Sequence, residues 1–225
     1  MTLRATVTFA VLTILSVATA GSALADPVAG DAVSVCADPQ MDVAARKAAL
    51  SDAGWSVVDD ADQTVAIART LVLHDGVTML QQRGDELTAF VDRLAPSLVA
   101  GIDAGSITML SHTGTDAILV TTSIDIPTAH FDCSFLMSDP ALARAILVDD
   151  GPAAEFFAAG TTDPFGNASF FALERDIEAM GWEGDWAPQS GQLSVLNPFP
   201  AVPDADILPR PALFKLRTAL RFDPS

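Results

Sequence analysis

Three histidines, with the carboxylates near them in sequence, are the side chains best suited to metal or acid–base chemistry. In His130-Phe131-Asp132 the first and third residues fall on one face if this segment is a strand. His112 lies in a predicted turn that can approach the same face if the two strands pair, and Asp116 follows it closely. The sequence thus contains one candidate zinc or iron site, formed by His112, His130, Asp132 and Asp116.

The alternative for these histidines is an ordinary role in turns, because all three lie near the ends of predicted elements. The paired histidines of an HExxH helix are missing. The sequence also contains no GxSxG or SxxK nucleophile motif and no GxGxxG or GxxxxGK[ST] phosphate loop. We therefore assign no catalytic residue from the sequence, and no cofactor other than this candidate transition metal.

A second candidate site is the segment Trp182-Glu183-Gly184-Asp185-Trp186, where two indoles flank two acids. Trp182 and Trp186 could stack on a sugar ring or on a cationic ligand. The alternative is that both fill the core, since a domain without tyrosine must use Phe and Trp for bulk.

The cysteine content predicts one disulfide. Cys36 and Cys133 are the only cysteines, and neither belongs to a CxxC motif or has a neighbouring histidine. An even pair in an exported protein forms a disulfide by default. Closing so long a loop would stabilise the fold by about 4 to 5 kcal/mol in the chain-entropy model.

The first 25 residues have the pattern of a cleaved signal peptide. Arg4 is the only charge before Asp26, an apolar run covers 7–17, and Ala23-Leu24-Ala25 fits a small-x-small cleavage site. We expect the mature protein to begin at Asp26. No cysteine lies between 22 and 26, so a lipid anchor is not expected. These features predict a periplasmic or secreted protein.

Charge and hydropathy restrict the partners of the mature chain, 26–225, which we expect to form a single domain. In the full sequence, twenty-nine acidic against twelve basic side chains give a formal net charge of −17. Such a surface repels nucleic acid and anionic lipid. Arg69 interrupts the longest apolar run after the signal, so no membrane anchor is expected after its cleavage.

The N-terminal two thirds of the chain show clear element signals. An Asp-Pro pair, with an N-cap carboxylate and a proline at the first helical position, predicts a helix from Asp38-Pro39 to Ala53 and another from Asp139-Pro140. Apolar periodicity adds helices at 62–74 and 85–103, where Pro96 is expected to kink or split the helix. Strands are predicted at 55–58, 106–111, 116–124 and 131–137.

The remaining residues, 151–225, are less regular. Five prolines between 197 and 211 predict an extended segment that wraps over the surface. The last strand alternates apolar residues from Phe214 to Phe222 with the basic residues Lys215, Arg217 and Arg221. We expect these cations to meet carboxylates on neighbouring strands; the alternative is an anion or partner site.

Together these observations predict an α+β fold in which N-terminal helices pack on an antiparallel β-sheet with one disulfide. The leading functional hypothesis is a non-enzymatic exported binding or accessory protein, whose partner is an unidentified protein or envelope ligand. A metal-dependent hydrolase or metal carrier using His112, His130 and Asp132 is one alternative. A carbohydrate- or envelope-binding module using Trp182 and Trp186 is the other.

Overall fold

The computed structural model describes residues 26–38, 40–124, 130–145, 161–162, 168–171, 189–200, 202 and 206–219. The predicted signal peptide and the Trp182–Trp186 segment lie outside these ranges. No helix in the described part of the chain is both long and apolar enough to cross a membrane.

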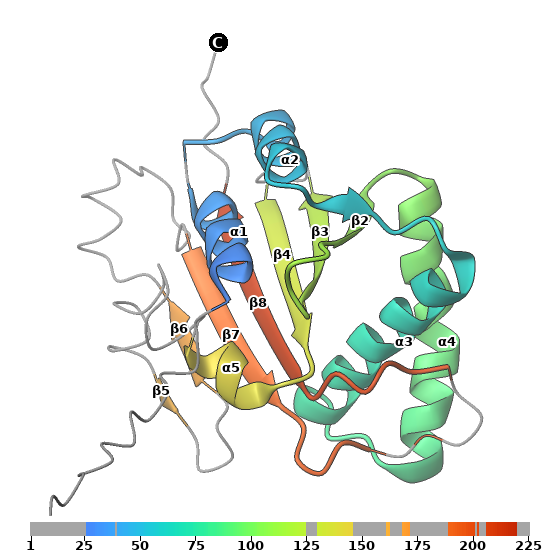
Figure 1. The fold of residues 1–225 in the computed structure, drawn as a ribbon. Helices are drawn as coiled ribbons and strands as arrows, with labels where there is room; N and C mark the ends of the chain where they lie inside the picture. The colour runs from blue at the N-terminus through green and yellow to red at the C-terminus, as the bar shows by residue number, and fades with distance from the viewer. Residues whose placement is uncertain are drawn as a thin grey trace, which may run out of the picture.

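One antiparallel sheet organises the described residues (Figure 1). Its eight strands run in the order β1-β2-β3-β4-β8-β7-β6-β5. Their bounds are β1 Ser56–Val57, β2 Ile107–Ser111, β3 Ile118–Ile124, β4 His130–Met137, β5 Thr161–Thr162, β6 Ala168–Phe171, β7 Gln189–Val195 and β8 Ala212–Ala219. The predicted strands at 106–111, 116–124 and 131–137 are thus confirmed, with ends shifted by one or two residues.

The last described strand, β8, lies in the middle of the sheet between β4 and β7. Phe214, Leu216 and Thr218 are buried on one face, as the alternating sequence predicts. Leu213 is also buried, on the other face. A central position explains this second buried face, because helices cover the sheet from both sides.

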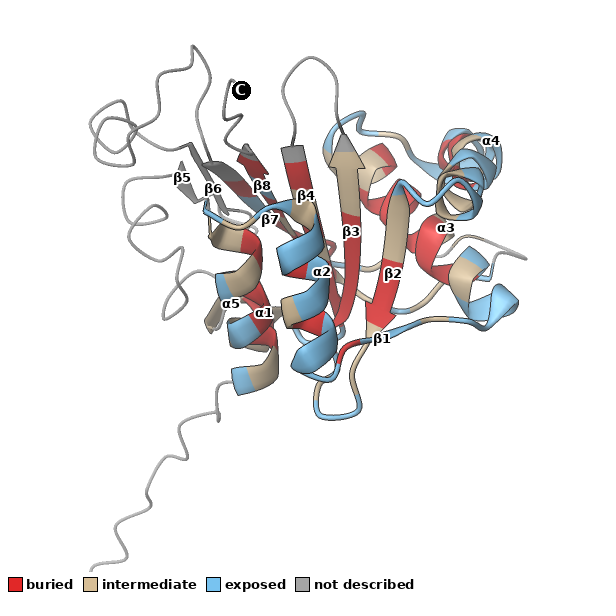
Figure 2. Ribbon diagram, turned by 90° about the horizontal axis from the view of Figure 1, so that it is seen from above, coloured by how far each residue is buried: buried red, intermediate tan, exposed pale blue. Residues whose placement is uncertain are grey.

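Helices cover the two faces differently. α1 (Pro27–Ala37), α2 (Val43–Asp52) and α5 (Pro140–Arg144) lie on one face, and α3 (Ala61–Thr78) and α4 (Gly84–Asp103) lie against the other (Figures 1 and 2). We call the first the disulfide face and the second the histidine face, after the groups described below. The predicted α+β class with N-terminal helices on an antiparallel sheet is confirmed.

The predicted helix from Asp38-Pro39 to Ala53 is wrong at its start. Asp26 caps α1 by accepting from the backbone N–H groups of Val28 and Ala29, and Pro27 occupies the first position. Asp38 ends that helix, and its carboxylate accepts from Gln40 N at 2.8 Å. The same Asp-Pro signal occurs at 26–27 and at 38–39, but the Asp38 carboxylate bonds to Gln40 N and does not cap a helix.

The other helix predictions are closer. α3 begins at Ala61 behind the cap Asp60, rather than behind Asp62. α4 continues through Pro96, so this proline does not split it. Asp139 caps α5, accepting from Ala141 N at 2.8 Å, as its Asp-Pro signal predicts.

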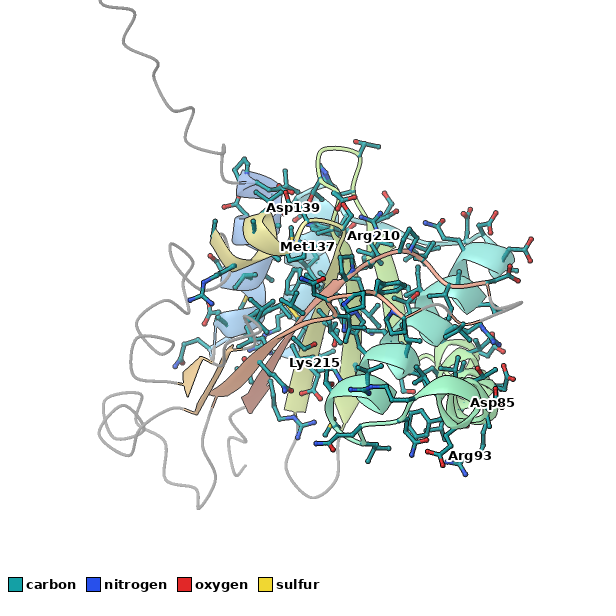
Figure 3. All side chains as sticks on the ribbon, turned by 90° about the horizontal axis from the view of Figure 1, so that it is seen from below. Asp85, Arg93, Met137, Asp139, Arg210 and Lys215 are labelled. Carbon is teal, nitrogen blue, oxygen red and sulfur yellow. A yellow bond between two sulfur atoms is a disulfide. The ribbon has the colours of Figure 1, made fainter. Side chains whose placement is uncertain are left out.

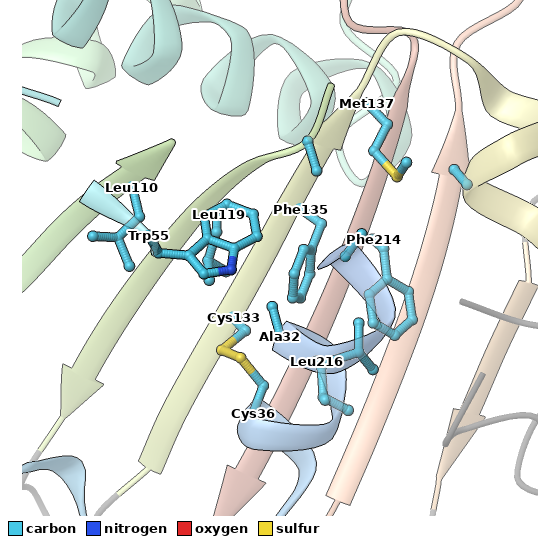
Figure 4. Packing of buried hydrophobic residues seen from close by; sticks show 14 of the residues in the cluster. Ala32, Cys36, Trp55, Leu110, Leu119, Cys133, Phe135, Met137, Phe214 and Leu216 are labelled. Atoms are coloured by element: carbon cyan, nitrogen blue, oxygen red, sulfur yellow. A yellow bond between two sulfur atoms is a disulfide. The ribbon is translucent and has the colours of Figure 1, made fainter. Parts of the chain in front are cut away.

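Alternate residues of the central strands enter two separate cores. Leu119, Phe135 and Phe214 belong to the disulfide face, whereas their neighbours Ile118, Leu136 and Leu213 belong to the histidine face. On the disulfide face Cys36 of α1 is bonded to Cys133 of β4, with Cα atoms 6.2 Å apart (Figure 4). The predicted disulfide is confirmed, and it fastens the N-terminal helix to the centre of the sheet.

A proline-rich strap joins β7 to β8 over the histidine face. It comprises the described residues 197–200, 202 and 206–211, none of which is in a helix or strand. Phe199, Val202, Ile207 and Leu208 pack against the core of that face. The predicted extended wrap is confirmed for these residues.

Candidate functional site

His112 and Asp116 lie together at the β2–β3 turn, but each is engaged in holding local structure. His112 Nδ1 accepts from Gly114 N at 2.8 Å, and its ring lies 5.8 Å from that of Trp55. Asp116 accepts from Ser138 N at 2.8 Å and pairs with Arg210 of the strap. Figure 3 shows Arg210 near the end of β4, where Met137 and Asp139 also lie.

The pKa of Asp116 reflects this environment. Partial burial acts to raise the pKa, but the hydrogen bonds from Ser138 and Arg210 outweigh it and hold the pKa below its ordinary value. The carboxylate is therefore an ionised structural link between the turn and the strap at neutral pH.

Asp132 lies near the end of the β3–β4 pair that is farther from His112 and Asp116. Ile118 pairs with Leu136, whereas Thr122 pairs with Asp132 and Ile124 with His130. Asp132 accepts from Arg217 Nε at 2.9 Å and from Arg217 Nη2 at 2.7 Å across β4 and β8. This bond raises the pKa of Arg217 and confirms the expected pairing for Arg217. For Lys215 the expectation is wrong, because this residue pairs with Asp75 of helix α3.

The strand register therefore separates the candidate metal ligands. His112 and Asp116 flank the turn before Ile118, and the six steps from Ile118 to Ile124 span about 20 Å. His130 and Asp132 lie toward the far end of that span. Among the described residues no three His, Cys, Asp or Glu side chains form a group that could hold a metal ion. The expected approach of His112 to His130 and Asp132 does not occur, because the hairpin turn lies at the wrong end.

Sequence reasoning missed two buried nitrogen groups that the fold brings into the core. The first is Arg46, which is fully buried beneath α2 on the disulfide face. Its Nη2 donates to the carbonyl of Asp38, and its Cζ lies 5.0 Å from the centre of the Phe131 ring. Nε and Nη1 have no acceptor among the described residues.

Burial is the largest influence on Arg46 and lowers its pKa to about 10, against the opposing attraction of Asp38 and Asp42. The group therefore remains a cation at neutral pH. An unsatisfied buried donor costs about 1 to 3 kcal/mol, and more when it is charged. The signal for Arg46 was present in the sequence, since it falls on the same helix face as Val43 and Leu50, where an apolar residue is expected.

The second group is His74 of α3, which is fully buried on the histidine face. Its Nε2 lies 2.8 Å from the carbonyl of Arg210, and its Nδ1 lies 3.3 Å from Ser194 Oγ. A neutral ring satisfies both contacts, since Nε2–H donates to Arg210 and Nδ1 accepts from Ser194. Burial is the main cause that lowers the pKa of His74 to about 4.

His74 therefore joins α3 to β7 and to the strap as a neutral group. A second link lies one turn earlier on α3, where Thr70 Oγ1 accepts from Leu208 N at 3.0 Å. Neither contact places His74 beside a carboxylate partner that would suit it for acid–base catalysis. Its role is to fasten the strap.

Comparison with known proteins adds no assignment. The chain has no significant match among protein-family models, curated proteins or solved structures.

Proposed function

We propose that this chain is a non-enzymatic binding or accessory protein that is exported to an oxidising compartment. The observation that carries the proposal is the disulfide between Cys36 and Cys133. Both cysteines are buried, so the bond links α1 to β4 inside the core of the disulfide face. Buried structural disulfides of this kind are typical of periplasmic and secreted proteins.

The pairing of two candidate carboxylates with arginines argues against their use in catalysis. Asp116 and Asp132, which were candidates for metal or acid–base chemistry, are paired with Arg210 and Arg217. These pairs link strap to turn and strand to strand. Carboxylates paired in this way hold elements of the fold together.

Export is tested by expressing the whole chain, with residues 1–25, in a Gram-negative host. We expect mature protein that begins at Asp26 in the periplasm or the medium, with no free thiol after denaturation without reductant. Protein that keeps both thiols and stays in the cytoplasm would overturn the assignment.

The binding or accessory role is tested against its metal-dependent alternatives by elemental analysis of the exported protein, purified without chelators or a metal column. We expect no stoichiometric transition metal. Near-stoichiometric zinc, iron or copper would contradict the proposal and favour a metal-dependent hydrolase or a metal carrier.

A further inference from the structure

The disulfide face contains two buried donor groups for which the described residues provide no acceptor. One is the guanidinium of Arg46, through Nε and Nη1, and the other is Nε1 of Trp55. Arg46 lies in the first turn of α2, and Trp55 follows the end of this helix (Figure 4 shows Trp55 beside Leu119). Arg46 and Trp55 are therefore buried donors that lack acceptors in the described part of the disulfide face.

The surroundings of Arg46 leave its hydrogen-bonding edges available. A guanidinium carries five N–H donors, all directed in its plane. The Phe131 ring lies against the guanidinium at 5.0 Å and uses no N–H donor. Of the three nitrogens only Nη2 has an acceptor in the described part of the chain, the Asp38 carbonyl.

Each of the two acids on the same linker has one carboxylate oxygen bonded to the backbone. Asp38 Oδ1 accepts from Gln40 N at 2.8 Å, and Asp42 Oδ1 accepts from Ala45 N at 2.7 Å. Both contacts fix the backbone between α1 and α2. Neither carboxylate accepts from Arg46 in the described part of the chain, so Nε and Nη1 of Arg46 are open to another acceptor.

We propose that Arg46 anchors a binding site for a carboxylate, located between the first turn of α2 and Phe131. This inference rests on the proposed function and names the chemical class of the ligand. A carboxylate is planar and can accept two N–H groups from one edge of a guanidinium. Because Arg46 is fully buried in the free protein, only a compact ligand group suits the position.

The guanidinium of Arg46 lies close to exposed residues. Asp38, whose carbonyl Arg46 contacts, belongs to the linker between α1 and α2, and Gln40 and Asp42 of that linker are exposed. The guanidinium thus lies directly beneath a surface segment.

The first experiment titrates formate into the full mature protein at constant ionic strength, with chloride as the balancing anion and thermal unfolding as the readout. We expect a saturable rise in the unfolding midpoint of at least about 3 °C. Arg46→Met removes the guanidinium and keeps the apolar stem, so its midpoint should show no saturable response. Phosphate serves as a comparison of anion shape, and a response to phosphate without one to formate would overturn the choice of carboxylate.

Arg93→Met is the matched control. Arg93 also lies over an aromatic ring, with its Cζ 5.8 Å from the centre of Phe90, but it is exposed on α4 (Figure 3). This variant should respond to formate as the unchanged protein does. A loss of response in both variants would show that the effect is not specific to Arg46 and would overturn the site.

A second measurement does not depend on the stability of a variant. The side-chain Nε–H resonance of Arg46, identified by its absence in Arg46→Lys, should shift saturably with formate in the unchanged protein. No shift, together with a large loss of stability in Arg46→Met, would mean that the donors are satisfied within the chain and that Arg46 is only structural. This outcome would leave the disulfide and export intact, so it is distinguishable from failure of the proposed function.

Discussion

The two faces of the sheet carry helices of similar kind but are fastened by different chemistry. On the disulfide face, a covalent bond joins α1 to β4, and a buried cation lies under α2. On the histidine face, a neutral imidazole and a threonine hydroxyl hold the strap to α3 through hydrogen bonds. Figure 2 shows how the helices of the two faces flank the sheet. We therefore expect the two cores to respond differently to reductant and to acid.

The largest expected effect comes from breaking the disulfide face. The Cys36→Ala/Cys133→Ala variant frees a loop whose ends are 97 residues apart. It should lower the free energy of unfolding by about 4 kcal/mol, because the unfolded chain gains conformational freedom. Chemical denaturation at pH 7 measures this loss. A loss below about 1 kcal/mol would mean that the bond contributes little to the fold.

Acid should act on the other face. The pKa of His74 is about 4 in the folded protein against an ordinary value of 6.5, so the unfolded chain binds the proton more readily. Stability from this group is complete above about pH 6.5 and declines as the pH falls toward 4, by up to about 3 kcal/mol. Denaturation curves between pH 7 and 4 measure it.

The control for this pH effect is His74→Leu. The variant should lose stability at pH 7, because the Arg210 carbonyl and Ser194 lose their shared partner. Its decline from pH 7 to 4 should nevertheless be smaller than that of the unchanged protein. Equal slopes in the two proteins would assign the acid sensitivity to other groups.

A smaller effect on stability is expected from replacing Gly54, which lies beside His112. Gly54 has φ +90°, and a Cβ there would lie 2.9 Å from His112 Nε2. Gly105 has φ +77° with nothing within 4 Å of a Cβ. Gly54→Ala should cost about 2 kcal/mol, and Gly105→Ala about 1 kcal/mol, since only the first adds a steric clash to backbone strain. Thermal unfolding of the two variants gives the difference directly, and equal costs would show that His112 moves aside freely.

The parts of the fold that followed from sequence are those with local signals. The cap Asp139, the strand alternation through Phe214 and Leu216, and the pairing of the two cysteines all needed only neighbouring residues or composition. The start of the first helix did not follow, because Asp26-Pro27 and Asp38-Pro39 carry the same local signal. Only packing of α1 on the sheet decides between them.

The candidate site was harder to predict from the sequence than the helices and strands, because it depends on contacts between distant residues. The predicted approach of His112 to His130 depended on which end of β4 lies beside the β2–β3 turn. Strand register is set by tertiary packing, so the sequence could not decide this. The burial of His74 and Arg46 could be predicted in part, since each occurs on an apolar helix face. Their partners Arg210 and Phe131 are distant in sequence, so no local pattern could assign their roles.

The most direct test of the central claim, that the two faces are stabilised independently, is a double-mutant cycle. It combines Cys36→Ala/Cys133→Ala with His74→Leu and measures the free energy of unfolding of each protein at pH 7. The two groups lie on opposite faces and share no partner in the described residues, so the losses should add to within about 0.5 kcal/mol. A coupling energy above about 1 kcal/mol would contradict the account and show that the sheet transmits strain between its faces.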